Sequence, residues 1–331
     1  IAPRASCVHD QPRSAGLPPG CAQGSECHVT WSLARGLVHP TQPAVGYAAV
    51  FAQYQRSWQG NTPQEVQQRL DADPTPVVIG PGGVPYVVDG HHELCCLDLW
   101  ASEGGDPTQV RLKLHVICDR AGLSADEFDG FLQSANFAYL LARPRGRPLD
   151  LPQPMRLQDL PSRFHFGRHG SDAFSNDIFR SLAAFIHVTG EEPVCIQRHA
   201  DRFCKRAFQK VCDEHRSGIP FLEFVWAYFL NEALLDKSKW TSPEAYEQFS
   251  KLAHTELLEN RSLDQFDANV WRGAASLLNP LCRSESAQRY VPPSYFSWRG
   301  LPGVVKTADE VLPEDPHCAL VATPRQCLRT A

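Results

Sequence analysis

Five consecutive residues, Asp89-Gly90-His91-His92-Glu93, carry the groups in this chain that are best suited to chemistry. Two imidazoles and two carboxylates in one short segment can exchange protons, orient one another or hold a cation. A β-branched run precedes them and an apolar stretch follows, so the segment predicts a strand, a turn and the start of a helix. A helix start offers unpaired N–H groups and the positive end of a dipole, which bind anions. We therefore expect any chemistry at this turn to be phosphate chemistry.

A structural role is the alternative for the same turn. Asp89 would then cap the helix, and His92 or Glu93 would only line it. Adjacent residues of a regular helix point about 100° apart, so His91 and His92 do not easily bind one metal ion together. In this alternative only His91 would contact a ligand.

Strands are predicted on both sides of the turn. Runs at 76–79 and 84–88 flank the glycine-rich residues 80–83, which is typical of a hairpin. A third strand is predicted at 110–118, because its apolar residues alternate along the chain. These strands and the helices near them indicate a small α+β domain.

Helices are predicted throughout the chain. A buried helix with proline in its first position is expected at 43–54. Thr62 and Glu65 have the spacing of a capping box, as do Ser124 and Glu127. The later helices are predicted at 175–188, at 194–215, at 220–230, from 241 onward and at 263–278.

Four segments follow from these elements. Residues 1–40 are expected to form an N-terminal arm, because proline and glycine interrupt any regular element there. Residues 41–150 form the α+β domain, 151–285 a mainly α-helical domain, and 286–331 a C-terminal tail. A chain of 331 residues is long enough for two such domains.

The composition narrows the classes of function. A formal net charge of −5 argues against a protein that coats nucleic acid, which would need clustered positive charge. One local basic patch is conceivable at Arg143, Arg145 and Arg147, although a solvated loop is the simpler interpretation. No run reaches the ~18 apolar residues that a membrane span needs, so no membrane partner is expected.

Twelve cysteines bear on the cellular compartment. Cysteines in both terminal segments predict disulfides, and with them a secreted or otherwise oxidising location. The alternative is a reduced, cytoplasmic protein with free thiols. The terminal cysteines are Cys7, Cys21, Cys27, Cys282, Cys318 and Cys327, whereas Cys95, Cys96, Cys118, Cys195, Cys204 and Cys212 are expected to pack as small apolar side chains.

Residues 85–94 resemble the signature of the ParB/sulfiredoxin superfold, in which a strand leads through a Gly-His-containing turn into a helix. The chain is most similar to the ParB-like nuclease family. Three further segments carry that resemblance, at 41–46, 176–183 and 220–227, so that it extends over roughly residues 41–235. It implies a small ParB/sulfiredoxin-like mixed-sheet domain followed by a mainly α-helical region.

The resemblance also implies roles for the turn. Gly90, His91 and His92 would cradle phosphate, as similar turns do for nucleotide triphosphate in ParB proteins, ATP in sulfiredoxins and phosphate in free serine kinases. His91 stands where sulfiredoxins have their redox cysteine, so sulfinic acid reduction is not expected. Glu93 replaces an arginine common in ParB proteins. This carboxylate favours a metal-assisted reaction, with Asp89 and Glu93 as ligands of Mg²⁺ or Mn²⁺, over tight binding of a nucleotide cofactor.

Two residues outside the turn are candidates for substrate binding. Gln42 either faces the same cleft or belongs to the start of the helix after Pro43. Arg180 either clamps the substrate, as the resemblance suggests, or pairs with Asp177 three residues earlier on the same helix.

Other candidates lie further along the chain. Ser181 is a predicted substrate-binding neighbour of Arg180. Glu223 lies in an otherwise apolar helix, so it is either a catalytic group or half of a buried pair. The polar loop with His165, Arg168 and His169 either closes over a cleft or is an ordinary surface loop.

Three functions are consistent with these residues. The first is a nuclease or phosphodiesterase acting on nucleic acid or a nucleotide, with His91, His92, Glu93 and Glu223 as catalytic residues. The second is an ATP- or ADP-dependent kinase of a small molecule such as serine. The third is a binding module without catalysis that recognises a small ligand or a protein.

Overall fold

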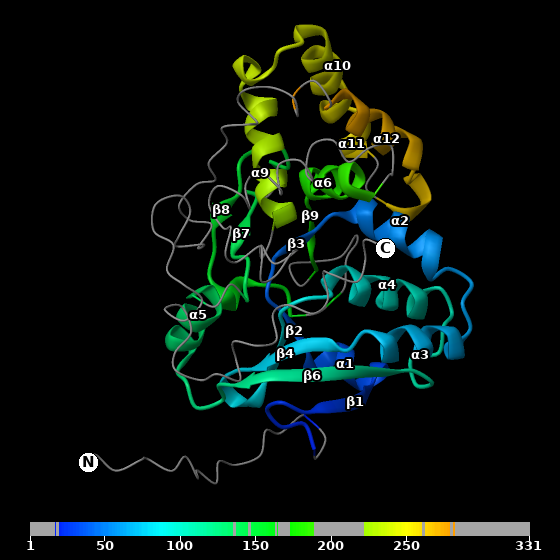
Figure 1. The fold of residues 1–331 in the computed structure, drawn as a ribbon, viewed down its shortest axis with the longest axis vertical. Coiled ribbons are helices and arrows are strands. Elements are labelled where there is room, and N and C mark those ends of the chain that lie inside the picture. Colours follow the sequence, from blue (N-terminus) through cyan, green and yellow to red (C-terminus); the bar gives the residue numbers. More distant parts are fainter. Residues whose placement is uncertain are drawn as a thin grey trace, which may run out of the picture.

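A five-stranded mixed sheet lies at one end of the molecule (Figure 1). The strands are ordered β1 (Glu26–Thr30), β6 (Arg111–Asp119), β4 (Thr75–Ile79), β5 (Pro85–Val87) and β2 (His39–Pro40). β4 runs antiparallel to β5 and parallel to β6, and β2 runs parallel to β5. The predicted hairpin and third strand are confirmed. This computed structural model describes residues 17, 20–134, 137–144, 147–162, 164, 173–188, 222–259, 262–278 and 281.

Five helices accompany the sheet. They are α1 (Trp31–Leu37), α2 (Tyr47–Ser57), α3 (Pro63–Ala72), α4 (His91–Ser102) and α5 (Ala125–Ser134). In Figure 1, α3 and α4 lie along one face of β4 and β6. Val110, Leu112, Leu114 and Val116, the predicted apolar face of the third strand, are all buried in the core beneath them.

Side-chain caps fix where several helices begin. The Thr62 hydroxyl accepts the backbone N–H of Glu65, and the Glu65 carboxylate accepts the backbone N–H of Thr62. Ser124 and Glu127 form the same reciprocal pair before α5. Both predicted capping boxes are therefore confirmed, and each stops its helix from extending backward into the preceding loop.

The N-terminal arm is shorter than the sequence predicts. Residues 26–40 form β1, α1 and β2, and β1 pairs antiparallel with β6 along its whole length. The exposed and buried residues of β1 alternate, which is the pattern of a strand with one buried face, and β1 is at the edge of the sheet. The prediction of an irregular arm is therefore wrong for residues 26–40.

A disulfide joins Cys21 and Cys27 and closes the loop that leads into β1. Cys118 on β6 is buried in an apolar cluster, as predicted, and it is also disulfide-bonded, which the sequence does not predict. Cys95 and Cys96 on α4 are buried free thiols. The predicted terminal residues Cys7, Cys282, Cys318 and Cys327 lie outside the described residues.

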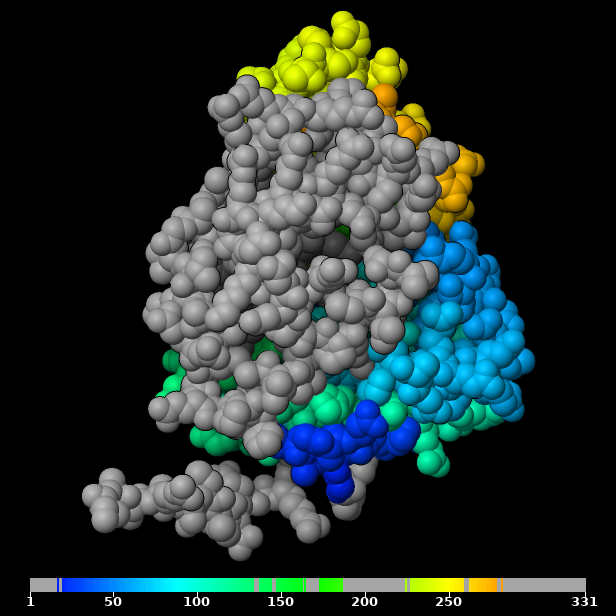
Figure 2. All heavy atoms as spheres, in the orientation of Figure 1, coloured from blue at the N-terminus to red at the C-terminus, as the bar shows by residue number. Residues whose placement is uncertain are grey.

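The other end of the molecule is mainly helical, as predicted (Figure 1). It contains α6 (Ile178–Val188), α9 (Leu222–Leu235), α10 (Pro243–His254), α11 (Glu256–Glu259) and α12 (Ala268–Leu277). The short strands β7 (Leu141–Ala142), β8 (Gln153–Pro154) and β9 (Ser175–Asn176) and 3₁₀ turns at 157–159, 237–239 and 263–265 also belong to the later part of the described chain. Another 3₁₀ turn, at 81–83, connects β4 to β5 in the sheet. The predicted helix at 194–215 lies outside the described residues. Figure 2 shows α10 and α12 at one end of the visible face and β1 at the other.

Two helix starts differ from the prediction for one shared reason. Strand β3 (Ala44–Val45) pairs in parallel with β9, so α2 begins at Tyr47 and α6 begins at Ile178. The pairing occupies the residues that the sequence assigns to the first turns of both helices. It also brings the N-termini of α2 and α6 side by side.

Helices α2 and α6 approach each other closely at Gly46. A Cβ atom added to Gly46 would lie 2.6 Å from the backbone nitrogen of Ser181, which leaves no room for any side chain. Ala48 on α2 is buried in the same apolar cluster as residues of α6, α9 and α12. The sheet end and the helical end of the molecule are therefore joined through α2.

None of the described helices is both long and apolar enough to cross a bilayer.

Candidate functional site

The predicted strand–turn–helix segment is present. β5 ends at Val87, and α4 begins at His91. Gly90 stands between them with φ of +88°, a left-handed conformation that favours glycine. The carboxylate of Asp89 accepts the N–H of Gly90 at 2.7 Å, which holds the turn closed.

Thr41 binds this turn from the neighbouring strand. β2 ends at Pro40 beside Val87, so the next residue, Thr41, lies at the same end of the sheet. Its backbone N–H donates to His91 Nε2 at 3.1 Å, and its hydroxyl donates to the Val87 carbonyl at 2.8 Å. Residues 41–46 belong to the family resemblance, but this contact of Thr41 is not predicted, because a two-residue strand that contains proline has almost no sequence pattern.

His91 is a packed and uncharged imidazole. Its ring lies against Phe164 and Phe174, with centroid separations of 5.6 and 6.2 Å. Burial, and to a lesser degree the charge of Arg180, lowers the pKa of His91 to about 3. Because Nε2 accepts a hydrogen bond, the ring proton is on Nδ1. His91 therefore has a structural role: its hydrogen bond fixes the position of Thr41 beside the turn.

The buried neutral His91 should make the protein less stable in acid. Its pKa is below the ordinary value of 6.5, so between pH 6.5 and about 3 the unfolded chain binds a proton that the folded chain does not. The free energy of unfolding should then fall by at most about 1.4 kcal/mol for each pH unit. His91→Gln, which keeps an acceptor near Nε2, should reduce this slope in urea melts at pH 7, 6 and 5. An unchanged slope would contradict the assignment.

His92 differs from His91 in its contacts. Its side chain is partly buried, and its Nε2 is buried without a hydrogen-bond partner. Burial lowers the pKa of His92 well below its ordinary value, and the charges of Arg180 and His91 act in the same direction. An uncharged imidazole nitrogen with no partner has a lone pair that can accept a proton, and the lowered pKa makes it a weaker base than an exposed histidine.

Arg180 supplies positive charge to this region from the first turn of α6. Its guanidinium lies over the ring of Phe224 on α9, 4.7 Å from the centroid. Burial lowers the pKa of Arg180 to about 10, while the charges of Asp177 and Asp89 act to raise it. Arg180 is thus cationic at neutral pH, and it interacts electrostatically with both imidazoles and with Asp89.

Asp177 pairs with Arg143 rather than only with its helix neighbour. The two side chains are buried and 3.0 Å apart, and the same Asp177 oxygen accepts the N–H groups of Phe179 and Arg180. The prediction of a solvated basic loop is therefore wrong for Arg143. Arg147, by contrast, is exposed and pairs with Asp150.

Arg143 connects several segments. It donates to the side chain of Asn231 on α9 and to the carbonyl of Asp150, and it lies over the ring of Phe179 at 4.8 Å. Its ion pair with Asp177 fixes the start of α6, where Arg180 stands. The sequence groups Arg143 with Arg145 and Arg147 in a proline-rich segment, and nothing in that pattern distinguishes the buried arginine from its neighbours.

The remaining predicted site residues have different surroundings. The Gln42 amide donates to the Ala44 carbonyl, which supports the start of β3. Ser181 is fully buried between α6 and α2, where its hydroxyl accepts the N–H of Ala49. Glu93 is buried in the first turn of α4, and Asp89 is exposed. Glu223 belongs to α9, but its side chain lies outside the described residues, as does the loop of His165, Arg168 and His169.

No three His, Cys, Asp or Glu side chains in the described segments are grouped as they would be around a metal ion. Asp89 and Glu93 belong to the turn and to the helix after it. Their predicted role as metal ligands stays a prediction.

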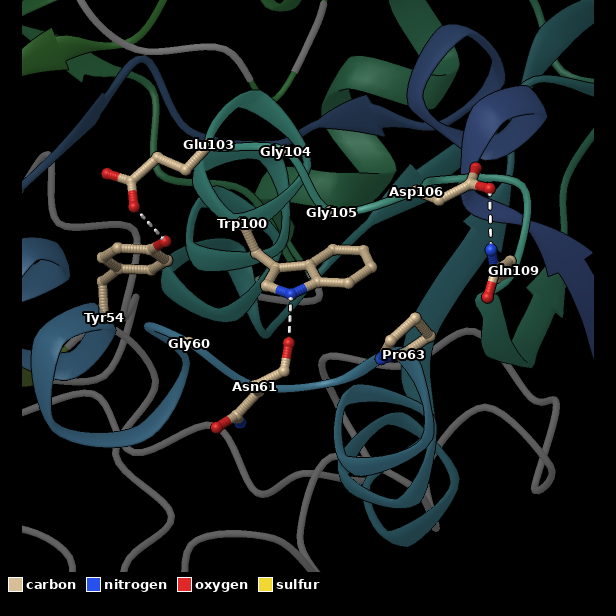
Figure 3. A pocket seen from close by; sticks show the side chains of 10 residues that line it. All are labelled: Tyr54, Gly60, Asn61, Pro63, Trp100, Glu103, Gly104, Gly105, Asp106 and Gln109. Atoms are coloured by element: carbon tan, nitrogen blue, oxygen red, sulfur yellow. Dashed lines mark hydrogen bonds between the residues drawn. The ribbon is translucent and has the colours of Figure 1, made fainter.

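A shallow pocket of about 370 Å³ lies at the opposite end of α4 (Figure 3). There the Tyr54 hydroxyl donates to Glu103, and the Trp100 indole N–H donates to the Asn61 carbonyl. A helix of this length spans ~18 Å, so the pocket is far from His91 and His92.

The chain was compared with known families and known structures. The model of the family described as "Putative ParB-like nuclease" matches residues 32–197, which is half of the chain. This protein belongs to that family. It is also similar to the crystal structure of protein Atu1540 from Agrobacterium tumefaciens, with 22% identity and a TM-score of 0.42 over 69% of this chain and 92% of that chain. No curated protein matches the chain.

Proposed function

We propose that this protein is a phosphodiesterase that cleaves nucleic acid at the turn between β5 and α4. The observation that carries the proposal is the buried, unpartnered Nε2 of His92 near the cationic Arg180. A base and a cation beside the N-terminus of α4 suit a phosphodiester, whose charge must be neutralised while a water is activated. Membership of a ParB-like nuclease family supports the same reaction class.

The proposed step is hydrolysis. A water oxygen bonds to phosphorus while His92 Nε2 takes a proton from that water. The bond from phosphorus to the leaving sugar oxygen breaks, its electron pair stays on that oxygen, and a proton from solvent completes the new hydroxyl. Arg180 and the N–H groups at the start of α4 stabilise the charge on the phosphoryl oxygens. His91 and Thr41 hold the turn in place.

A metal ion is a further part of the proposal. Asp89 and Glu93 are the residues that would hold Mg²⁺ or Mn²⁺, which would supply charge neutralisation at the phosphate. Comparing cleavage rates in Mg²⁺, Mn²⁺ and EDTA tests the role of the metal ion by itself.

The disulfides of Cys21 and Cys118 favour the proposal of a secreted or oxidising location, where hydrolysis needs no supplied nucleotide.

Phosphoryl transfer is the second candidate function, favoured by the same anion site. The first test incubates the protein with a fluorescent single-stranded oligonucleotide, and a parallel reaction contains ATP or ADP with serine. We expect cleavage of the oligonucleotide and no phosphoserine.

Cleavage of the oligonucleotide should drop by roughly 10²–10³-fold in Arg180→Gln, because one charge-stabilising donor is removed. Phosphoserine without strand cleavage would replace the proposal with the kinase.

A further inference from the structure

A pair of stacked aromatic rings lies next to the guanidinium of Arg180. The guanidinium lies over Phe224 on α9, 4.7 Å from the ring centroid. The ring of Phe224 stacks on that of Tyr139, with centroids 3.9 Å apart and ring planes 23° from parallel. All three side chains are buried. Because a cation is attracted to the face of an aromatic ring most strongly where water is excluded, Phe224 is a strong partner for Arg180.

The backbone of Tyr139 is connected to the turn through Thr41. The N–H of Tyr139 donates to the Thr41 carbonyl at 2.9 Å. Thr41 donates its own N–H to His91 Nε2 and its hydroxyl to the Val87 carbonyl. Tyr139 is therefore linked to the turn by its main chain and to the ring beneath Arg180 by its side chain.

The proposed reaction depends on where the guanidinium is held. His92 belongs to α4 and Arg180 to α6, so the base and the cation come from different parts of the chain. A charged donor stabilises a transition state when it is already in place, and a misplacement of about 1 Å can cost about 100-fold in rate. An arginine side chain has many rotamers, and a ring beneath the guanidinium restricts them.

We propose that Phe224 and Tyr139 are positioning residues of the phosphodiesterase, whose stacked rings hold the Arg180 guanidinium in place relative to His92. This inference rests on the proposed function and adds two residues to it. Neither ring touches the substrate or takes part in the transfer of a proton. Their loss should therefore act on cleavage only through Arg180.

A double-mutant cycle tests this dependence on Arg180. Phe224→Leu, Arg180→Gln and the variant with both changes are assayed on the single-stranded oligonucleotide. In the otherwise native protein, Phe224→Leu should lower kcat/KM roughly tenfold, because a desolvated cation–π contact is lost. In the Arg180→Gln background it should lower kcat/KM by less than about twofold. Equal losses in the two backgrounds would overturn the proposal, because the ring would then act independently of Arg180.

The matched control is Phe229→Leu. Phe229 is also a buried phenylalanine of α9, and its ring also lies near a cation, Lys239, at 6.0 Å from the centroid. The two substitutions remove the same atoms from the same helix, so both should lower the melting temperature. Only Phe224→Leu should lower kcat/KM. An equal loss of kcat/KM in Phe229→Leu would assign the effect to the packing of α9 and overturn the proposal.

Tyr139 is tested by two substitutions. Tyr139→Leu removes the stacked ring and should reduce cleavage about as much as Phe224→Leu does. Tyr139→Phe keeps a ring for stacking and should recover most of this loss. Equal losses in the two variants would assign the effect to the hydroxyl and overturn the role of the stack.

Binding of inorganic phosphate separates this inference from the proposed function. Isothermal titration calorimetry compares the native protein with Phe224→Leu, and we expect weaker binding in the variant. Weaker binding in a protein that cleaves no oligonucleotide would reject the phosphodiesterase and keep the positioning of Arg180. Equal binding by two proteins that both cleave would reject the positioning and keep the phosphodiesterase. A native protein that neither binds phosphate nor cleaves would reject both.

Discussion

His92→Gln is expected to lower the rate of phosphodiester cleavage by roughly 10²–10⁴-fold, the usual contribution of one general base. Nε2 of His92 is the buried nitrogen without a partner at the turn, so its loss removes the proton acceptor. The amide of glutamine has similar size and does not take up a proton at neutral pH. The effect should appear in kcat more than in KM, because the variant keeps Arg180 and the helix start, the groups proposed to bind the phosphate.

The matched control is His254→Gln. His254 is an exposed histidine in the last turn of α10, where its ring contacts the Ser250 carbonyl. The control should cleave at the native rate. Equal cleavage by the His92 and His254 variants would exclude His92 as the base, and thermal melts of both proteins show whether either change disturbs the fold.

Arg143→Met is expected to destabilise the protein by about 3–5 kcal/mol, the cost of breaking a buried ion pair from one side. The change leaves the buried carboxylate of Asp177 without its strongest partner and removes donors to Asn231 and Asp150. Urea unfolding monitored by circular dichroism measures the loss.

A second substitution shows whether the uncompensated charge is the cause. Asp177→Asn keeps an oxygen that can accept the N–H groups of Phe179 and Arg180, and it removes the charge. The Arg143→Met/Asp177→Asn double variant should therefore be more stable than Arg143→Met alone. A double variant that is less stable would mean that lost packing over Phe179, and not the charge, dominates.

The local features of the site could be predicted from the sequence. The turn needs glycine at one position, and the polar residues around Gly90 are adjacent in the chain, so their pattern is visible without a structure. Capping boxes are equally local, which is why Thr62 and Ser124 were placed correctly.

The features that the sequence does not predict depend on pairings between segments that are far apart in the chain. Thr41 meets His91 only because β2 pairs with β5, and α6 begins late only because β3 pairs with β9. Arg143 resembles a solvated arginine until α6 and α9 surround it. Helical spacing predicts Arg180 as the partner of Asp177. The buried guanidinium of Arg143 offers Asp177 a stronger interaction, because it lies in a less polar environment.

Because α2 joins the sheet end to the helical end, the site cannot be cut out as a fragment. A chain ending at residue 150 would keep the turn of Gly90 and His91. It would lack Arg180, and it would leave Arg143 without Asp177 and Asn231. Contacts of such long sequence separation also form late and slowly during folding. The contacts that bring Arg180 to the turn of His91 and His92 should therefore be among the last to form as the molecule folds.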